Sequence, residues 1–220
     1  MQARLLLAAS LLAASAILGG CATSRSELQL APPTAKAAPA NPNARAVVIR
    51  SIADDRVFAQ APPEPSPPSL GFEGADAAAA DVKVRAIGRK RNTFGKALGD
   101  VLLQPGQTVT GLVRDNLAVA FQDAGYRVVT DPATAPGALT VDVHVTKFWS
   151  WFQPGFWAIT LAADVETKLD LSGGGLPEPV TVHVEESRQM ANDGAWMEIV
   201  DKALTAYRVA AEARLKALPH

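Results

Sequence analysis

Two histidines stand in matching contexts and are the first residues of this 220-residue chain whose pattern suggests chemistry. His144 lies in VDVHV and His183 in VTVHV, so the valines take one face of an expected strand and the histidine takes the other. If the QPG turn pairs Phe152 with Phe156, His144 lies opposite Asp164 on the next strand, and a similar closure of the second hairpin brings His183 near Asp164 or Glu166. Two histidines around a carboxylate offer ligands for a metal such as zinc.

The distance across the strands argues against one shared ion. Two histidines with one strand between them lie roughly 9 to 10 Å apart, which a single ion spans only if both side chains reach far. We therefore favour solvent-facing polar pairs across the strands. His144, His183 and Asp164 remain weak metal candidates, and we expect no metal cofactor.

The sequence contains none of the common catalytic or nucleotide-binding motifs. It has no G-x-S-x-G, no H-E-x-x-H and no second cysteine for a metal cluster. In GRKRNTFGKAL, six residues separate Gly88 from Gly95 where a phosphate loop has four, and Ala97 replaces its Ser or Thr. The net charge of −1 gives no support for nucleic-acid binding. We expect neither an enzyme nor a protein that binds nucleotides or nucleic acids.

The only cysteine, Cys21, ends a segment with the pattern of a lipoprotein signal peptide. Arg4 precedes an apolar run that is too short to span a bilayer as an ordinary helix. The small residues of LGGC match a bacterial lipobox. We predict that residues 1–20 are removed and that the Cys21 thiol carries diacylglycerol, so that the mature protein incorporates palmitate and has no free thiol. The loss of Arg4 changes the formal charge from −1 to −2.

The residues after Cys21 predict a location and a tether. In Gram-negative bacteria an Asp directly after the lipidated cysteine retains a lipoprotein at the inner membrane, whereas Ala22 and Thr23 favour the periplasmic face of the outer membrane. The segment 21–45 is rich in Ala and Pro and predicts a tether. Residues 46–220 have the size of a single periplasmic domain.

Two stretches of this domain have helical periodicity. Apolar residues recur at helical spacing after Thr108, which can cap the helix, and before Gly125, which can end it in a left-handed turn. A second stripe of apolar residues follows Asn192, another candidate cap. Both stretches predict amphipathic helices.

Period-two alternation predicts the sheet. AVVIRSI, from Ala46, predicts a first strand, and three alternating segments separated by QPG and GGGLPEP predict an antiparallel meander. Prolines near residues 60–80 predict a surface excursion. Residues 82–103 have no clear assignment, although apolar residues such as Phe94 indicate buried parts. The expected fold is α+β, a two-layer sandwich of a mostly antiparallel sheet with two helices packed on one face.

The segment KFWSWFQPGFWA contains six of the thirteen aromatic residues of the chain. Strand parity places one group of them in the core beneath the helices: Trp149, Trp151 and Trp157. It turns the other group outward unless a bulge reverses the parity, and these are interaction-surface candidates: Phe148, Phe152 and Phe156. Either the Pro-rich excursion covers the phenylalanines or they are open to a partner. Insertion into a membrane is a further alternative, which a lipid anchor makes superfluous.

A basic run accompanies the unassigned segment. It consists of Arg85, Arg89, Lys90, Arg91 and Lys96. One interpretation is a solvated, charged loop. The other is contact with an acidic partner or with lipid headgroups, which makes Arg89, Lys90 and Arg91 further interaction-surface candidates.

Several of these features together resemble the YajG-type family of outer-membrane lipoproteins. They are the lipobox, the DDR of Asp54 to Arg56, the segment from Leu102 to Val128, and the helix that begins with Asn192. The resemblance implies a location and a fold, and it carries no established reaction.

The favoured function is a non-enzymatic lipoprotein of the cell envelope that acts as a protein-interaction or structural module. It would contact the membrane through its lipid and bind an envelope protein or itself. One alternative is an accessory lipoprotein of an envelope transport or assembly complex. Another is an envelope glycan hydrolase, for which Asp164 and Glu166 are the nearest carboxylate candidates.

Overall fold

A computed structural model describes residues 25–36, 41, 43–71, 73–92, 94–155, 157–174, 176 and 178–218. The predicted signal peptide and the predicted lipidation site, Cys21, lie outside the described residues, and so does Phe156. No helix in the described ranges is both long enough and apolar enough to cross a membrane.

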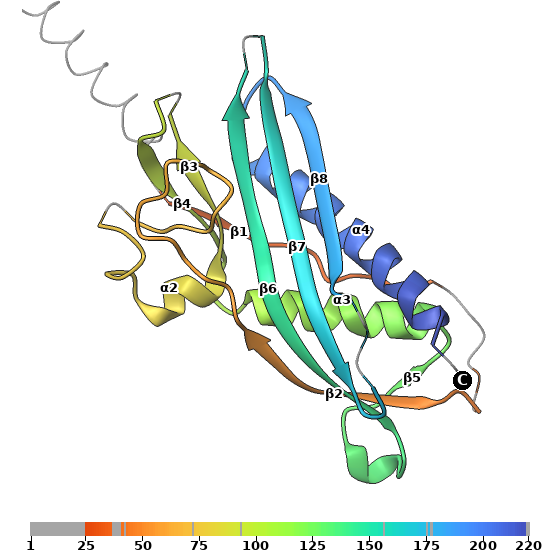
Figure 1. Cartoon of the computed structure of the whole chain (residues 1–220). Coiled ribbons are helices and arrows are strands. Elements are labelled where there is room, and N and C mark those ends of the chain that lie inside the picture. The colour runs from red at the N-terminus through yellow and green to blue at the C-terminus, as the bar shows by residue number, and fades with distance from the viewer. Residues whose placement is uncertain are drawn as a thin grey trace, which may run out of the picture.

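The fold is α+β, as predicted, with an eight-stranded mixed sheet in the described part of the chain (Figure 1). The strands are β1 Ser26–Leu28, β2 Ala46–Asp54, β3 Ala86–Arg91, β4 Ala97–Leu103, β5 Arg127–Val128, β6 Leu139–Pro154, β7 Ile159–Leu171 and β8 Val180–Arg188. The helices are α2 Ala80–Arg85, α3 Val109–Asp123 and α4 Asp193–Lys216, with a short 3-10 turn, η1, at Pro132–Thr134.

The predicted antiparallel meander is present as β6, β7 and β8. One edge of β6 pairs with β7 along most of its length. Its other edge is shared by two parallel partners, because β2 pairs with residues 139–145 and β3 touches it at the single pair Gly88–Ser150. The parallel pairs β1–β4 and β2–β5 complete the sheet.

The two predicted helices, α3 and α4, pack on one face of the sheet and against each other. Each begins at its expected cap. Thr108 Oγ1 accepts a hydrogen bond from the Gly111 amide at 3.0 Å, and Asn192 Oδ1 accepts one from the Ala195 amide at 2.9 Å. Gly125 has the left-handed φ of 95° that follows the end of α3.

The unassigned residues 82–103 form the end of α2 and the β3–β4 hairpin. Gly88 allows β3 to approach β6, since a Cβ at this position would lie 2.7 Å from Ser150 Oγ. Phe94 lies in the turn of the hairpin and is exposed, so the expectation of a buried residue at that position is wrong.

The prediction of a tether is wrong for residues 25–36. Ser26 to Leu28 pair with β4 as an edge strand, and Leu28 and Leu30 are buried in the main core. The Gln107 side chain bonds both backbone groups of Leu30, at 3.0 and 2.7 Å. Alternating leucines and an available sheet edge therefore add this segment to the domain, against its Pro-rich surroundings.

A β-bulge moves the aromatic segment from one face of the sheet to the other. The register with β7 shifts between Val145 and Lys147, and the residues that follow exchange faces. Phe148 therefore enters the core beneath the helices, whereas Trp149 and Trp151 join a second core on the opposite face. The faces predicted for Phe148, Trp149 and Trp151 are therefore exchanged, because the bulge that the sequence prediction left open is present.

The Pro-rich excursion covers this second core. Its Leu70 and Ala75 are buried with Trp149, Trp151 and Ala162. Trp149 Nε1 donates a hydrogen bond to the Pro65 carbonyl at 3.2 Å, and Phe58 meets Trp149 edge to face, with ring centroids 6.2 Å apart. The excursion thus covers tryptophans, where the sequence suggested that it would cover phenylalanines.

Candidate functional site

The two histidines lie on the open part of the sheet face opposite α3 and α4, but they do not share a carboxylate. His183 pairs with Asp164, one of the two carboxylates that the sequence allowed, with 2.6 Å between Nδ1 and Oδ1. The β6–β7 turn closes at the pair Pro154–Ile159 instead of the predicted pair, and together with the bulge this places His144 opposite Lys168 instead of Asp164. His144 Nδ1 lies 2.6 Å from Asp55 Oδ2. The predicted row of His, carboxylate and His is therefore not formed.

The carboxylates of this face have local partners. Asp164 binds Lys147 at 2.5 Å in addition to His183, and Glu166 accepts a hydrogen bond from Thr146 at 2.6 Å. Both acids lie on β7, so they do not face each other across a cleft. Within the described residues, no group of three or more His, Cys, Asp or Glu could hold a metal ion.

Three residues of the basic run lie on strand β3, and two of them, Arg89 and Arg91, lie beneath the excursion. Arg91 is buried and donates hydrogen bonds to the Pro62 carbonyl at 2.9 Å and to Ser69 Oγ at 3.3 Å. Arg89 donates to the Gly71 carbonyl. Burial lowers the pKa of both guanidinium groups. Neither a solvated loop nor an exposed contact surface describes these two side chains, which hold the excursion on the sheet.

Beyond Gly88 and Ser150, the β3–β4 and β6–β7 hairpins have no further pairing between them in the described part of the chain. Both hairpins point to the same end of the sheet, the upper end in Figure 1. A hollow of about 860 Å³ lies between them and the start of α4. We call this hollow the notch pocket; it is lined by Arg25, Ser26, Lys90, Arg91, Leu98, Phe152, Ile159, Trp196 and residues 189–194.

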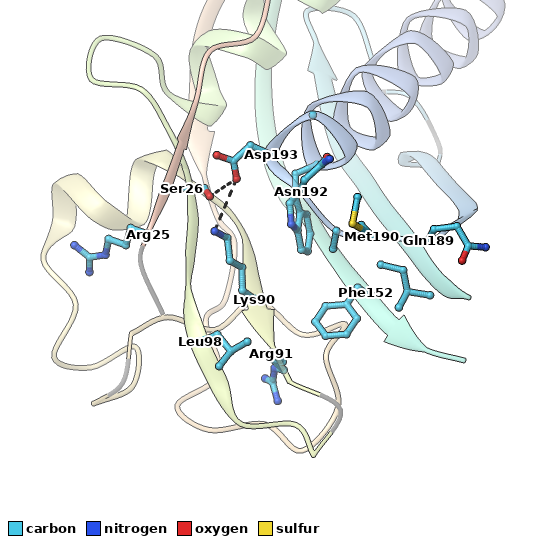
Figure 2. A pocket seen from close by; sticks show the side chains of 14 residues that line it. Arg25, Ser26, Lys90, Arg91, Leu98, Phe152, Gln189, Met190, Asn192 and Asp193 are labelled. Carbon is cyan, nitrogen blue, oxygen red and sulfur yellow. Dashed lines mark hydrogen bonds and ion pairs between the residues drawn. The ribbon is translucent and has the colours of Figure 1, made fainter. Parts of the chain in front are cut away.

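The notch pocket combines an apolar wall with a polar one (Figure 2). Phe152 and Met190 stand on one side, and Lys90 stands on the other beneath Asp193. Lys90 Nζ lies 3.8 Å from Asp193 Oδ1, and the Ser26 hydroxyl also donates to this carboxylate. The pocket therefore presents apolar surface beside paired charges.

A buried donor without an acceptor also lies at this pocket. Trp196 is fully buried and lines the notch, and its Nε1 has no hydrogen-bond partner among the described residues. A buried N–H without an acceptor is costly.

The residues that the sequence predicted for an interaction surface lie in different parts of the structure. Phe148 is buried in the main core, so its prediction as a surface residue is wrong. Phe152 and Lys90 line the notch pocket together. Arg91 contributes to the pocket wall but is fixed beneath the excursion, and Arg89 lies outside it.

Sequence reasoning missed most of the other features of this end. Phe94 is 93% exposed at the β3–β4 tip, Trp157 is 87% exposed at the β6–β7 tip, and Met190 is 69% exposed before α4. Trp157 was expected in the core. The only signal for its exposure was its place beyond Pro154 and Gly155, which end the strand, and nothing in the sequence indicated that Arg25 borders the same pocket.

No family model matches the chain, and no curated protein matches it significantly. The chain aligns with solved structures that include a Xanthomonas campestris protein assigned to the family DUF330. The sequence identity is 17% and the TM-score is 0.48, and the alignment covers 85% of this chain and 92% of the other. A protein of Helicobacter pylori described as a homologue of a neuraminyllactose-binding hemagglutinin has 10% identity and a TM-score of 0.36, with 87% and 92% covered. Similarities at this level do not place the chain in a family.

Proposed function

We propose that the protein is a non-enzymatic lipoprotein of the outer membrane, facing the periplasm, and that it binds a protein partner in the notch pocket. The observation that carries the proposal is the convergence of Phe152 and Lys90. They come from different hairpins, they were selected from the sequence for separate reasons, and they line one hollow.

The lining of the pocket suits a protein partner. Phe152, Met190 and Trp196 offer apolar area, and aromatic and methionine side chains are enriched at protein interfaces. Lys90 and Asp193 offer polar contacts that would fix the orientation of the bound segment.

The proposed location at the outer membrane rests on lipidation of Cys21. The lipobox and the resemblance to YajG-type lipoproteins support it. Radiolabelled palmitate should enter the wild-type chain and should not enter Cys21→Ser. Equal incorporation into both would overturn the anchor.

Photocrosslinking in living cells tests the partner. A photoreactive phenylalanine analogue at Phe152 or Met190 should capture a discrete protein. The same analogue at Val209, which is 59% exposed on α4, is the matched control and should capture none. Identical products from all three positions would contradict a specific site in the notch.

A further inference from the structure

The described chain begins at the end of the domain that carries the hairpin tips. Arg25 lines the notch pocket, and its Nε lies 3.1 Å from Asp100 on β4. Strand β1 runs parallel to β4, and β4 begins just after the β3–β4 tip. Because Asp100 pairs with Arg89, the chain enters the sheet beside the base of this hairpin, roughly 20 Å along the strand from Phe94.

Covalent geometry limits how far the anchor can lie from this end. Cys21 precedes Arg25 by four residues, and four residues span at most about 14 Å even when fully extended. This step rests on the proposed lipidation of Cys21. If Cys21 is acylated, the membrane surface lies within that distance of Arg25, whatever conformation the intervening residues adopt.

The two hairpin tips project to a similar level. Strands β3 and β6 run parallel at the pair Gly88–Ser150. Phe94 follows Gly88 by six residues, and Trp157 follows Ser150 by seven. Each tip therefore extends roughly 20 Å beyond the shared pair, and both tips face the same way in Figure 1.

The exposed apolar residues at this end are chemically suited to a bilayer surface. The described residues include six large hydrophobic side chains that are exposed, and the only aromatic ones among them are Phe94 and Trp157. Tryptophan and phenylalanine favour the interfacial region of a membrane. Lys96, beside Phe94, is exposed and places positive charge at the same end, where anionic headgroups would attract it.

We propose that this end of the domain rests on the bilayer that holds the Cys21 lipid, with Phe94 and Trp157 in the headgroup region. The acyl chains fix the distance of the domain from the membrane but leave its orientation free, and the two tips supply the orientation. The contact is therefore not superfluous beside the anchor. A partner in the notch pocket would then be met at the membrane surface.

Depth-dependent fluorescence quenching tests this placement on the lipidated full-length mature chain. Because Cys21 is acylated, Phe94→Cys, Trp157→Cys and Val209→Cys each introduce the only free thiol, which is labelled with a small environment-sensitive fluorophore. Val209 is the control, since it lies sixteen residues after the start of α4, or roughly 24 Å along the helix axis. The chains are reconstituted into vesicles of phosphatidylethanolamine and phosphatidylglycerol that contain a lipid-borne quencher.

We expect at least twofold stronger quenching by the lipid-borne quencher at positions 94 and 157 than at 209. Equal quenching at all three sites, in protein that still floats with the vesicles, would overturn this inference and leave the anchor intact. Shielding of 94 and 157 from both iodide and the lipid quencher would overturn it in favour of protein contact. A chain that does not float with the vesicles would overturn the anchor and this inference together. Circular dichroism confirms that each labelled variant is folded.

Discussion

The two halves of the aromatic segment in β6 and its turn have opposite environments. Over residues 148–152, the helices cover one face of the strand and the Pro-rich excursion covers the other, so Phe148 and Trp149 are almost completely buried. From Gln153 to Gly155 the residues are exposed, and Trp157 is 87% exposed. One half of the cluster stabilises the fold, and the other half lies at the exposed tip of the hairpin.

The difference shows that density of aromatic residues alone does not identify a functional surface. The buried half satisfies its polar group internally, through the hydrogen bond from Trp149 to the Pro65 carbonyl. The exposed half lies on a hairpin whose strands are already paired to the tip, at Pro154–Ile159. We therefore expect the two halves to respond differently to mutation.

The largest expected effect separates the halves by stability. Trp149→Ala should lower the free energy of unfolding by about 3–5 kcal/mol, because it leaves a cavity in the second core. Trp157→Ala should change it by less than about 0.5 kcal/mol, because the side chain is exposed. Urea denaturation followed by circular dichroism measures both. Similar losses in the two variants would contradict the distinction between the buried half of the aromatic segment and its exposed tip.

The next effect concerns the divergence of the two hairpins. Gly88→Ala should cost roughly 1–3 kcal/mol, because the new Cβ would lie 2.7 Å from Ser150 Oγ. Gly194→Ala is the control, since its Cβ would meet only Asn192 Oδ1 at 3.4 Å, and it should cause no loss. If Gly88→Ala were as stable as the wild type, close contact between β3 and β6 would not define the base of the notch.

A smaller effect concerns the Pro-rich excursion, which covers the buried half of the aromatic segment. Arg91→Met removes the hydrogen bonds to Pro62 and Ser69, so the excursion should be cleaved several-fold faster in limited proteolysis. Lys90→Met is the neighbouring control, because Lys90 lies in the notch pocket and should leave the cleavage rate unchanged. Equal acceleration by both variants would show a general loss of stability instead.

The smallest expected effect is a pH dependence of the stability of the folded domain. This dependence does not involve the exposed β6–β7 tip. Hydrogen bonds from Lys216 and Lys36 lower the pKa of Glu212, and those from Arg50 and Ser51 lower the pKa of Asp142 to about 2. A lowered pKa in the folded state stabilises the fold above the unfolded pKa of about 4. This stabilisation is lost as the pH falls through the folded value.

Glu212→Gln should therefore lower the melting temperature slightly at pH 7, and the difference from the wild type should shrink progressively as the pH falls below about 4. Thermal unfolding monitored across this range checks it. A difference that grew on acidification would contradict the sign of the shift.

Local patterns in the sequence predicted the parts of the fold whose cause is local. The capped helices α3 and α4 follow from helical stripes after Thr108 and Asn192, and the meander follows from alternation between turns. The pairing of His183 with Asp164, one of the two predicted alternatives, follows from the same alternation in β7 and β8.

The bulge after Val145 could not be located from the sequence, because an extra residue in a strand leaves no distinct pattern. It exchanged the faces of Phe148 and Trp149, whereas the closure of the β6–β7 turn at Pro154–Ile159 accounts for most of the shift of His144 away from Asp164. The notch pocket was also beyond sequence reasoning, since it joins Arg25, Lys90, Phe152 and Met190 from four segments. Its apolar members resemble core residues until the divergence of the hairpins is known.

The most direct test of the account compares the two turns of the meander on the lipidated protein in vesicles. A nitroxide spin label at Trp157→Cys reports on the β6–β7 tip, and one at Ser172→Cys reports on the exposed turn after β7. At position 157 the nitroxide should collide with oxygen more often than with a water-soluble nickel chelate. At position 172 the order of the two collision frequencies should be reversed. An aqueous profile at both positions would contradict the placement of the aromatic tip on the membrane.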